Sequence, residues 1–243
     1  VAADRAAAAG RRVAAAILVN PNNPTGTSVS REELAALSAL AARRGFAIVS
    51  DEVFLDYRFA DRKGDVRVAA AEAGEALVFS LGGLSKSVAL PQLKLGWILA
   101  NGPAALLHEA LDRLSWIADS FLSVGTPVQV ALPGLLAWGE GAAAALRARV
   151  LANHAALAEA LSPLAEATVA PLAGGWSAVV RLPAVEPEEE LALRLLAEED
   201  LLVHPGYFFD FPYEAFLVAS LLPEEGTFRE GGRRLARGLS ARR

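Results

Sequence analysis

Polar side chains follow three apolar stretches, each of which has the length of a buried strand. The first stretch runs into an amide-rich turn with Asn23, the second ends at Asp51, and the third precedes a glycine-rich segment with Lys86. A lysine amine can form a Schiff base with a carbonyl compound, and a carboxylate can keep a pyridinium nitrogen protonated. An asparagine amide can donate a hydrogen bond to a phenolate oxygen. The three residues together suit a carbonyl cofactor built on a pyridine ring.

Each of these residues also has an ordinary structural explanation. An aspartate at a strand end is most often a turn or cap residue, and a single lysine is most often solvated. The turn around Asn23 could serve only as a tight loop. Their joint occurrence after successive strands is what favours a common site.

The elements around these residues form a strand–helix–strand unit. Residues 14–20 (AAAILVN) and 46–50 (FAIVS) read as buried strands. Ser30 and Glu33 have the spacing of a capping box, and Gly45 is a suitable end for the helix between the strands. Such a unit implies parallel strands in a sheet with helices on its faces.

Further apolar stretches extend this sheet. Residues 76–81 and 93–100 are predicted strands, and residues 103–114 are a predicted helix. In open parallel sheets, ligands bind beyond the carboxyl ends of the strands. We therefore expect Asn23, Asp51 and Lys86 to converge at one edge of the sheet.

The chain is expected to contain two domains of different character. Residues 1–120 predict part of a large domain, residues 121–162 a helical connection, and residues 163–243 a small α+β domain. The predicted fold class is α/β, with a three-layer, mostly parallel sheet that is truncated at the N-terminus. In the small domain the pattern predicts strands at 167–172, 176–182, 201–205 and 215–222 and helices at 187–199 and 227–239, the last beginning with a Thr227–Glu230 capping box.

Composition excludes several classes of function. The chain has 23 basic and 28 acidic residues, a net charge of -5, which does not favour nucleic acid binding. It has no cysteine, so disulfides and thiolate metal sites are excluded, and its three histidines lack metal-ligand spacing. No apolar run reaches the roughly 18 residues of a membrane span, and the N-terminal residues do not form a signal peptide. A cytoplasmic location is the expectation.

Three motifs carry a resemblance to a known family. The segments are NPNNPTG (20–26), SDEVFLDY (50–57) and GGLSKSVALPQLKLGW (82–97). In this order and approximate spacing they resemble the large domain of class I/II aminotransferases, which are fold-type I pyridoxal-phosphate enzymes. Less sharply, GGWSAVVRL (174–182) and VHPGYFFDF (203–211) resemble the small domain of that family. The resemblance covers nearly the whole chain.

The resemblance implies a role for each matched position. Lys86 would form the Schiff base with pyridoxal 5'-phosphate and move the substrate proton, and Asp51 would pair with the pyridine nitrogen. Asn23 would donate a hydrogen bond to the 3'-oxygen of the cofactor, and the proline after it would follow a cis bond. Ser85 would lie in the phosphate-binding loop. Lys94 stands where the family usually has a phosphate-binding arginine, so it keeps the charge but loses the bidentate fork.

Lys94 is also the rival of Lys86 for the Schiff base. It lies in an alternating Leu93–Lys94–Leu95 segment, as a strand residue would, whereas Lys86 lies in a glycine- and serine-rich loop. The loop lets the Lys86 amine reach a cofactor, and we favour Lys86.

Three positions depart from the family pattern. Phe54 replaces a tyrosine that would donate a hydrogen bond to the cofactor, and Gly83 replaces a phosphate-binding serine. Val218 replaces the arginine that grips the substrate carboxylate. Arg181 on a neighbouring strand is a possible replacement for that arginine, and His204 is a further candidate to approach the site.

The resemblance implies amino-group transfer between an amino acid and a 2-oxo acid, in a homodimer. A lyase or decarboxylase that uses the same cofactor is the nearest alternative, because the carboxylate-binding arginine is replaced. A non-catalytic fragment or degenerate subunit is another. The chain begins with Val1 and contains no methionine, so we expect it to lack an N-terminal part with a glycine-rich phosphate cradle.

Overall fold

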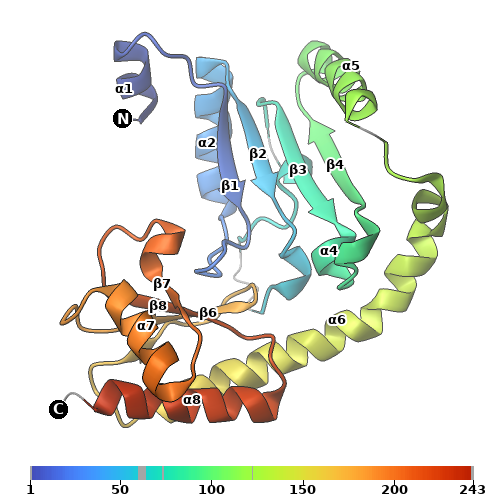
Figure 1. The fold of residues 1–243 in the computed structure, drawn as a ribbon. Coiled ribbons are helices and arrows are strands. Elements are labelled where there is room, and N and C mark those ends of the chain that lie inside the picture. The colour runs from blue at the N-terminus through green and yellow to red at the C-terminus, as the bar shows by residue number, and fades with distance from the viewer. Residues whose placement is uncertain (1, 60–63, 73, 122, 242–243) are drawn as a thin grey trace. The chain divides into compact units, whose positions relative to one another are not determined.

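The computed structural model describes residues 2–59, 64–72, 74–121 and 123–241. The chain divides into two compact units, each of which has its own sheet (Figure 1). Unit 1 consists of Val1–Asn22 and Thr27–Glu140, and unit 2 consists of Asn23–Gly26 and Gly141–Arg243. The short loop Asn23–Gly26 therefore belongs with the C-terminal part of the chain.

Unit 1 contains a four-stranded sheet in the order β1-β2-β3-β4. Strands β1, β2 and β3 are parallel, and β4 is antiparallel to β3. Their bounds are Ala15–Val19, Ala47–Asp51, Val78–Gly83 and Gly96–Asn101. The predicted α/β class with a mostly parallel sheet is confirmed. The other elements of unit 1 before the long helix are α1 (Ala2–Ala8), α2 (Arg31–Arg44), η1 (Leu55–Tyr57), α3 (Ala69–Glu72), α4 (Leu84–Ser87), η2 (Pro91–Leu93) and α5 (Ala104–Ser120).

The predicted capping box of α2 is present. The Ser30 hydroxyl accepts a hydrogen bond from the Glu33 N–H at 3.2 Å, and the Glu33 carboxylate accepts one from the Ser30 N–H at 2.9 Å. The second bond lowers the pKa of Glu33. Because the pKa is lowered in the folded chain, this contribution to stability is present at neutral pH and is lost as acid protonates the carboxylate. Gly45 ends the helix in the left-handed conformation, at φ 68°.

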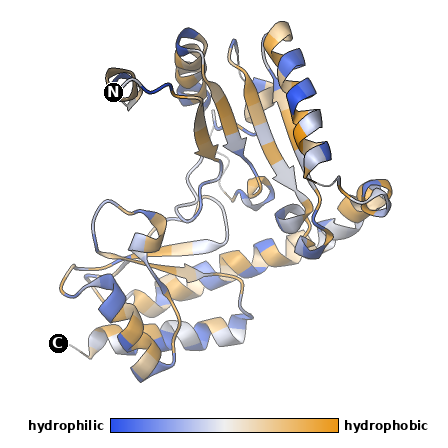
Figure 2. Ribbon diagram, turned by 45° about the horizontal axis from the view of Figure 1, so that its top comes forward, coloured by the Kyte–Doolittle hydropathy of each residue, from blue (hydrophilic) through white to orange (hydrophobic). Residues whose placement is uncertain are grey.

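One face of the unit 1 sheet packs against α2 and α3. Leu34, Ile48 and Val78 are almost completely buried in this core. On the other face, Ile17 is 75% exposed and Ile98 is 50% exposed. The expectation that the first strand is buried on both faces was therefore wrong. Apolar residues nevertheless run along most of the sheet (Figure 2).

Helix α6 (Thr126–Leu161) is one continuous helix of 36 residues with Pro133 inside it. The division between the two units falls within this helix, since unit 1 ends at Glu140 and unit 2 resumes at Gly141. Within unit 1, the first half of α6 packs against the buried Leu84 of α4 and against Val88, the residue that follows this helix. A Cβ at Gly139 would lie 2.2 Å from the Val88 Cβ, so only glycine permits this approach. This packing fixes α4, which carries Lys86.

Unit 2 contains a second sheet in the order β5-β6-β8-β7, with antiparallel pairing throughout. Its elements are β5 (Thr168–Val169), β6 (Ser177–Arg181), α7 (Glu188–Glu199), β7 (His204–Pro205), η3 (Gly206–Phe209), β8 (Phe216–Ser220) and α8 (Glu225–Ser240). The predicted cap at Thr227 was wrong, because α8 begins at Glu225 and Thr227 lies in its first turn. Glu230 instead binds Arg233 and Arg234 of the same helix.

The segment between β7 and β8 is held by Glu188 at the start of α7. This side chain is 3% exposed. Its Oε1 accepts hydrogen bonds from the N–H groups of Ala215 and Phe216 at 2.8 and 2.7 Å, and its Oε2 accepts one from Tyr207 at 2.9 Å. A single carboxylate thus satisfies three backbone donors of the connecting segment.

Replacing Glu188 with alanine is expected to lower the free energy of unfolding by about 2–4 kcal/mol, because three backbone donors lose a charged acceptor. Urea unfolding followed by circular dichroism measures the change. Glu188→Gln keeps an acceptor oxygen and should lose less, and the exposed neighbour Glu190→Ala serves as the control. Equal losses in Glu188→Ala and Glu190→Ala would contradict this account of the segment.

Candidate active site

In unit 1, Asp51 and the segment that carries Lys86 lie at the ends of adjacent parallel strands. Asp51 of β2 is in register with Leu81 of β3, and Lys86 follows five residues after Leu81. The Asp51 side chain is half-buried, and its Oδ1 accepts a hydrogen bond from the Val53 N–H at 3.1 Å. This is the turn-forming contact expected of an aspartate at a strand end, and it orients the carboxylate at the carboxyl edge of the sheet.

Lys86 lies on α4, directly after β3. Its Nζ is 6.0 Å from the centroid of the Phe54 ring. Phe54 is 9% exposed and stands three residues after Asp51, so the ring connects the two segments. At this distance the ring contributes a weak cation–π attraction for the ammonium group. The predicted lysine and the predicted carboxylate therefore belong to neighbouring segments of one unit.

The other two residues predicted in this region differ in their surroundings. Ser85 is half-buried on α4, beside Lys86. Lys94 is exposed and has a left-handed backbone, at φ 50°. Placing Lys94 in a strand was wrong, because η2 starts at Pro91 and β4 begins only at Gly96. Proline lacks the N–H that a strand ladder needs, which favours the turn.

The structure gives a physical reason for glycine at position 83. A Cβ at Gly83 would lie 3.1 Å from the Leu95 carbonyl oxygen and 3.3 Å from the Gly96 Cα. These distances are shorter than ordinary van der Waals contacts, so the close approach of β4 leaves little room for the serine of the family pattern. The nearby Tyr57 is completely buried in η1.

In unit 2, Asn23 lies against the small sheet. The Ser177 hydroxyl of β6 donates a hydrogen bond to Asn23 Oδ1 at 3.3 Å. The bond between Asn23 and Pro24 is cis, as predicted. A Cβ at Gly26 would lie 2.4 Å from the Gly174 carbonyl oxygen, so the loop packs tightly on the start of the small sheet. Because Oδ1 accepts from Ser177, the Nδ2 group is the end of this amide that can donate elsewhere.

Sequence reasoning did not single out Ser177. It lies inside the GGWSAVVRL segment, but a serine on a strand carries no signal of its own. Only the register of β6 and the placement of the 23–26 loop reveal its contact with Asn23.

The β8 face that includes Val218 is apolar at its centre. Val218 is 2% exposed and pairs with Val179 on β6 and with His204 on β7. Arg181 is exposed and pairs with Phe216, two residues along β8 from Val218. Directly paired side chains lie on one face of an antiparallel sheet, so His204 and Val218 share a face.

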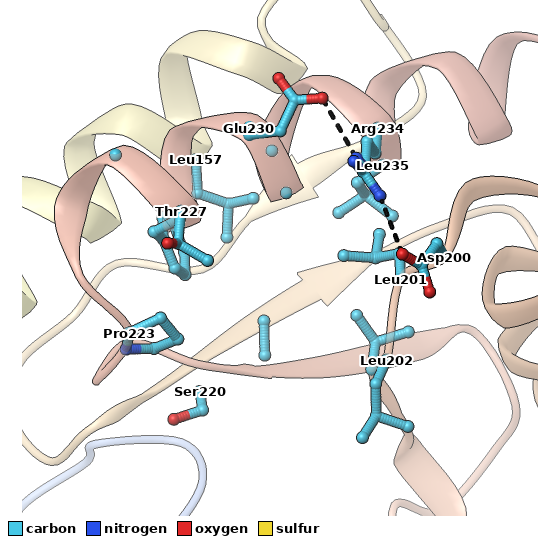
Figure 3. A pocket seen from close by; sticks show the side chains of 16 residues that line it. Leu157, Asp200, Leu201, Leu202, Ser220, Pro223, Thr227, Glu230, Arg234 and Leu235 are labelled. Atoms are coloured by element: carbon cyan, nitrogen blue, oxygen red, sulfur yellow. Dashed lines mark hydrogen bonds and ion pairs between the residues drawn. The ribbon is translucent and has the colours of Figure 1, made fainter.

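A cavity of about 630 Å³ lies elsewhere in unit 2, between α8, β8 and the segment that precedes β7 (Figure 3). Arg234 spans its rim, with Glu230 Oε1 at 3.1 Å and Asp200 Oδ2 at 3.4 Å. Leucine side chains, among them Leu157 and Leu201, line much of the remainder. None of the residues predicted for the site lines this cavity.

The described ranges contain no group of three or more histidine, cysteine, aspartate or glutamate side chains that could hold a metal ion. Over the same ranges, no helix combines the length and the apolar character needed to cross a membrane.

The curated relatives that the sequence matches are aminotransferases. Tyrosine aminotransferase of Bos taurus is 29% identical over 216 residues, which are 86% of this chain and 47% of that protein. Alanine aminotransferase of Mycobacterium tuberculosis is 27% identical over 222 residues, or 87% of this chain and 50% of that protein. The chain thus spans about half the length of the curated relatives it matches.

The fold and the family model agree with these relatives. A PLP-dependent aminotransferase from Streptococcus suis has a TM-score of 0.78 at 25% identity, over 93% of this chain and 57% of that one. An Escherichia coli aminotransferase has a TM-score of 0.81 at 22% identity, over 94% and 57% of the two chains, and this likeness shows the fold. The model described as aminotransferase class I and II matches residues 2–225. With the matched motifs placed at the strand ends, the chain belongs to the class I and II aminotransferase family.

Proposed function

We propose that this chain forms the lysine-bearing part of an aminotransferase that moves an amino group from an amino acid to a 2-oxo acid with pyridoxal 5'-phosphate. The observation that carries the proposal is the family match together with the placement of Asp51 and Lys86 after adjacent parallel strands. The chain spans about half of its curated relatives, so the activity is proposed for the protein of which these residues are part.

The residues present fit this cofactor. Its aldehyde needs an amine, its ring nitrogen a carboxylate, and its phenolate oxygen a hydrogen-bond donor. Lys86 and Asp51 of unit 1 would supply the first two. The resemblance assigns the third to Asn23, whose Oδ1 accepts from Ser177, which leaves Nδ2 as the end that would donate. Ser85 and Lys94 would hold the phosphate through a hydroxyl and a positive charge.

When bound, the cofactor supplies an electron sink for the carbanion at the substrate Cα. Lys86 would attach the cofactor in the resting state and then move a proton from the substrate Cα. Asp51 would hold the ring nitrogen in its protonated form, since a carboxylate beside a cation favours both charges. The Ser177 hydroxyl would orient the Asn23 amide through their hydrogen bond.

Val218 specifically supports one alternative to amino-group transfer. An apolar, buried valine stands where the family pattern has a carboxylate-binding arginine. An enzyme that releases the substrate carboxylate as carbon dioxide, or that eliminates a substituent, depends less on an arginine that binds this carboxylate. We therefore retain a decarboxylase or lyase with the same cofactor as the second candidate.

One experiment tests the proposal and separates the alternatives. The purified chain is incubated with pyridoxal phosphate, reduced with borohydride and digested, and the modified lysine is located by mass spectrometry. A parallel sample receives a ¹⁵N-labelled amino acid and a 2-oxo acid. Modification at Lys86 with label in a new amino acid supports transamination, and loss of carbon dioxide or of a substituent supports the second candidate. Absence of any modified lysine supports a non-catalytic chain.

Phe54→Tyr is expected to lower the pH at which the visible absorption of the cofactor-loaded protein changes, by about one pH unit. A phenol hydroxyl at this position would donate to the cofactor oxygen and stabilise the deprotonated form, and a hydrogen bond to a charged group contributes about 1.5 kcal/mol. A spectroscopic pH titration measures the change, with the exposed Phe121→Tyr as control. An unchanged titration would contradict the position proposed for the ring.

A homodimer in the cytoplasm is part of the same proposal. Trp116 of α5 and Trp138 of α6 are 76% and 68% exposed, and large exposed aromatic side chains suit burial in a protein interface. Sedimentation equilibrium of the chain would measure the assembly.

A further inference from the structure

A cavity in unit 1 opens on the face of the sheet opposite to Asp51, with a few polar groups in a largely apolar lining. Ser80 pairs with Ser50, the neighbour of Asp51 in β2, and successive residues of a strand point to opposite faces. Because the Ser80 hydroxyl donates to Glu52, the Glu52 carboxyl group lies on the Ser80 face and away from Asp51. Glu52 lines a cavity of about 330 Å³ together with Ser80, Ser87 and Trp97. None of the five residues proposed for the cofactor lines it. This cavity is therefore distinct from the proposed site.

Glu52 brings a buried carboxyl group to this cavity. The residue is 6% exposed. Its Oε1 accepts hydrogen bonds from the Ala69 N–H at 2.8 Å and from the Ser80 hydroxyl at 2.9 Å. Among the residues that the structure describes, no group donates to Oε2. One oxygen is thus fixed by the protein, and the other remains for a ligand.

The ionisable side chains that line the cavity are acidic. Asp56 is its second acidic lining residue, and the described lining contains no lysine, arginine or histidine. A buried carboxylate with no positive charge beside it is costly even when one oxygen is hydrogen-bonded, and a cation that enters the cavity offsets that cost. A metal ion is a poor candidate, because the described residues contain no group of three potential ligands that includes Glu52.

Trp97 forms an aromatic wall of the same cavity. It pairs with Gly82 across β3 and β4, and a Cβ at Gly82 would lie 2.3 Å from the indole Nε1. The indole ring therefore packs directly against the backbone of Gly82, which covers part of the ring. The residue is still 40% exposed, so part of the ring is open to a ligand.

A carboxylate and an indole in one small cavity are the groups that recognise an organic ammonium ion. We propose that this cavity binds a small primary amine with a flat apolar group, its ammonium on Glu52 Oε2 and its apolar part on Trp97. The volume suits a ligand at the lower end of the usual range for small-molecule sites. The proposal is independent of the aminotransferase activity, because it needs no cofactor.

The test is calorimetric titration of the cofactor-free chain with benzylammonium chloride and, separately, with neutral benzyl alcohol. The ammonium compound should bind at least about tenfold more tightly, a difference of about 1.4 kcal/mol. Equal affinity, or no heat of binding up to millimolar benzylammonium, would overturn the proposal.

Two adjacent carboxylates provide the matched variants. Glu52→Gln keeps an acceptor for Ala69 and Ser80 but removes the charge, so benzylammonium should bind about tenfold more weakly. Asp51→Asn removes a charge on the other face and should leave binding unchanged. The reverse pattern would place the amine on the cofactor face and overturn the proposal. If Glu52→Gln does not fold, Trp97→Leu decides, and its binding should also weaken at least severalfold.

Discussion

Replacing Lys86 with arginine is expected to abolish covalent attachment of pyridoxal phosphate and to lower any transaminase kcat/KM by at least about 10²–10⁴-fold. Arginine keeps the positive charge near the Phe54 ring, but it is not deprotonated in proteins and so forms no Schiff base. The same change removes the base that moves the substrate proton, and a positioned acid–base group contributes about 10²–10⁴ in rate. Borohydride reduction followed by peptide mass spectrometry measures attachment directly, whether or not the chain turns over.

Lys94→Arg is the matched control, because it makes the same replacement at the rival lysine. Lys94 is exposed in a left-handed turn, whereas Lys86 is half-buried on a helix fixed by α6. We expect Lys94→Arg to retain the reducible linkage and to change mainly the affinity for the phosphate group. Loss of the linkage in Lys94→Arg, with its retention in Lys86→Arg, would reverse the assignment of the two lysines.

Asp51→Asn is expected to lower kcat/KM by about 10²–10³-fold, the usual effect of removing one preorganised electrostatic group. The asparagine keeps an oxygen that can accept the Val53 N–H, so the turn after β2 should remain intact. What is lost is the negative charge that keeps the ring nitrogen of the cofactor protonated. Covalent attachment at Lys86 should persist, because the amine is unchanged.

The measurements for Asp51→Asn separate chemistry from stability. Steady-state kinetics should show the loss in kcat, and urea unfolding should show a change of less than about 0.5 kcal/mol, as expected for a turn that keeps its acceptor. Asp112→Asn removes an equal charge from exposed helix α5 and controls for net charge. Full activity in Asp51→Asn would exclude this carboxylate as the partner of the ring nitrogen.

The sequence by itself determined the local elements whose signals are short-range. Ser30, Glu33 and Gly45 specify the ends of α2, because capping depends on groups a few residues apart. The motifs around Asn23, Asp51 and Lys86 indicated the family, and the strand–helix–strand pattern indicated the parallel pairing of the first two strands. The order of the four strands in the sheet came only from the structure. The same local reasoning was wrong for Thr227, where the tertiary environment starts the helix earlier.

Only the tertiary structure decided which side chains meet. The contact of Ser177 with Asn23 and that of Phe54 with Lys86 join residues far apart in the chain, and their distances depend on register and packing. Adjacent Asp51 and Glu52 look alike in the sequence, yet Asp51 ends β2 beside Leu81 whereas Glu52 binds Ser80 on the opposite face of the sheet. Glycines 82, 83 and 139 are explained only by the groups that approach them, because a missing side chain gives no signal until its neighbours are placed.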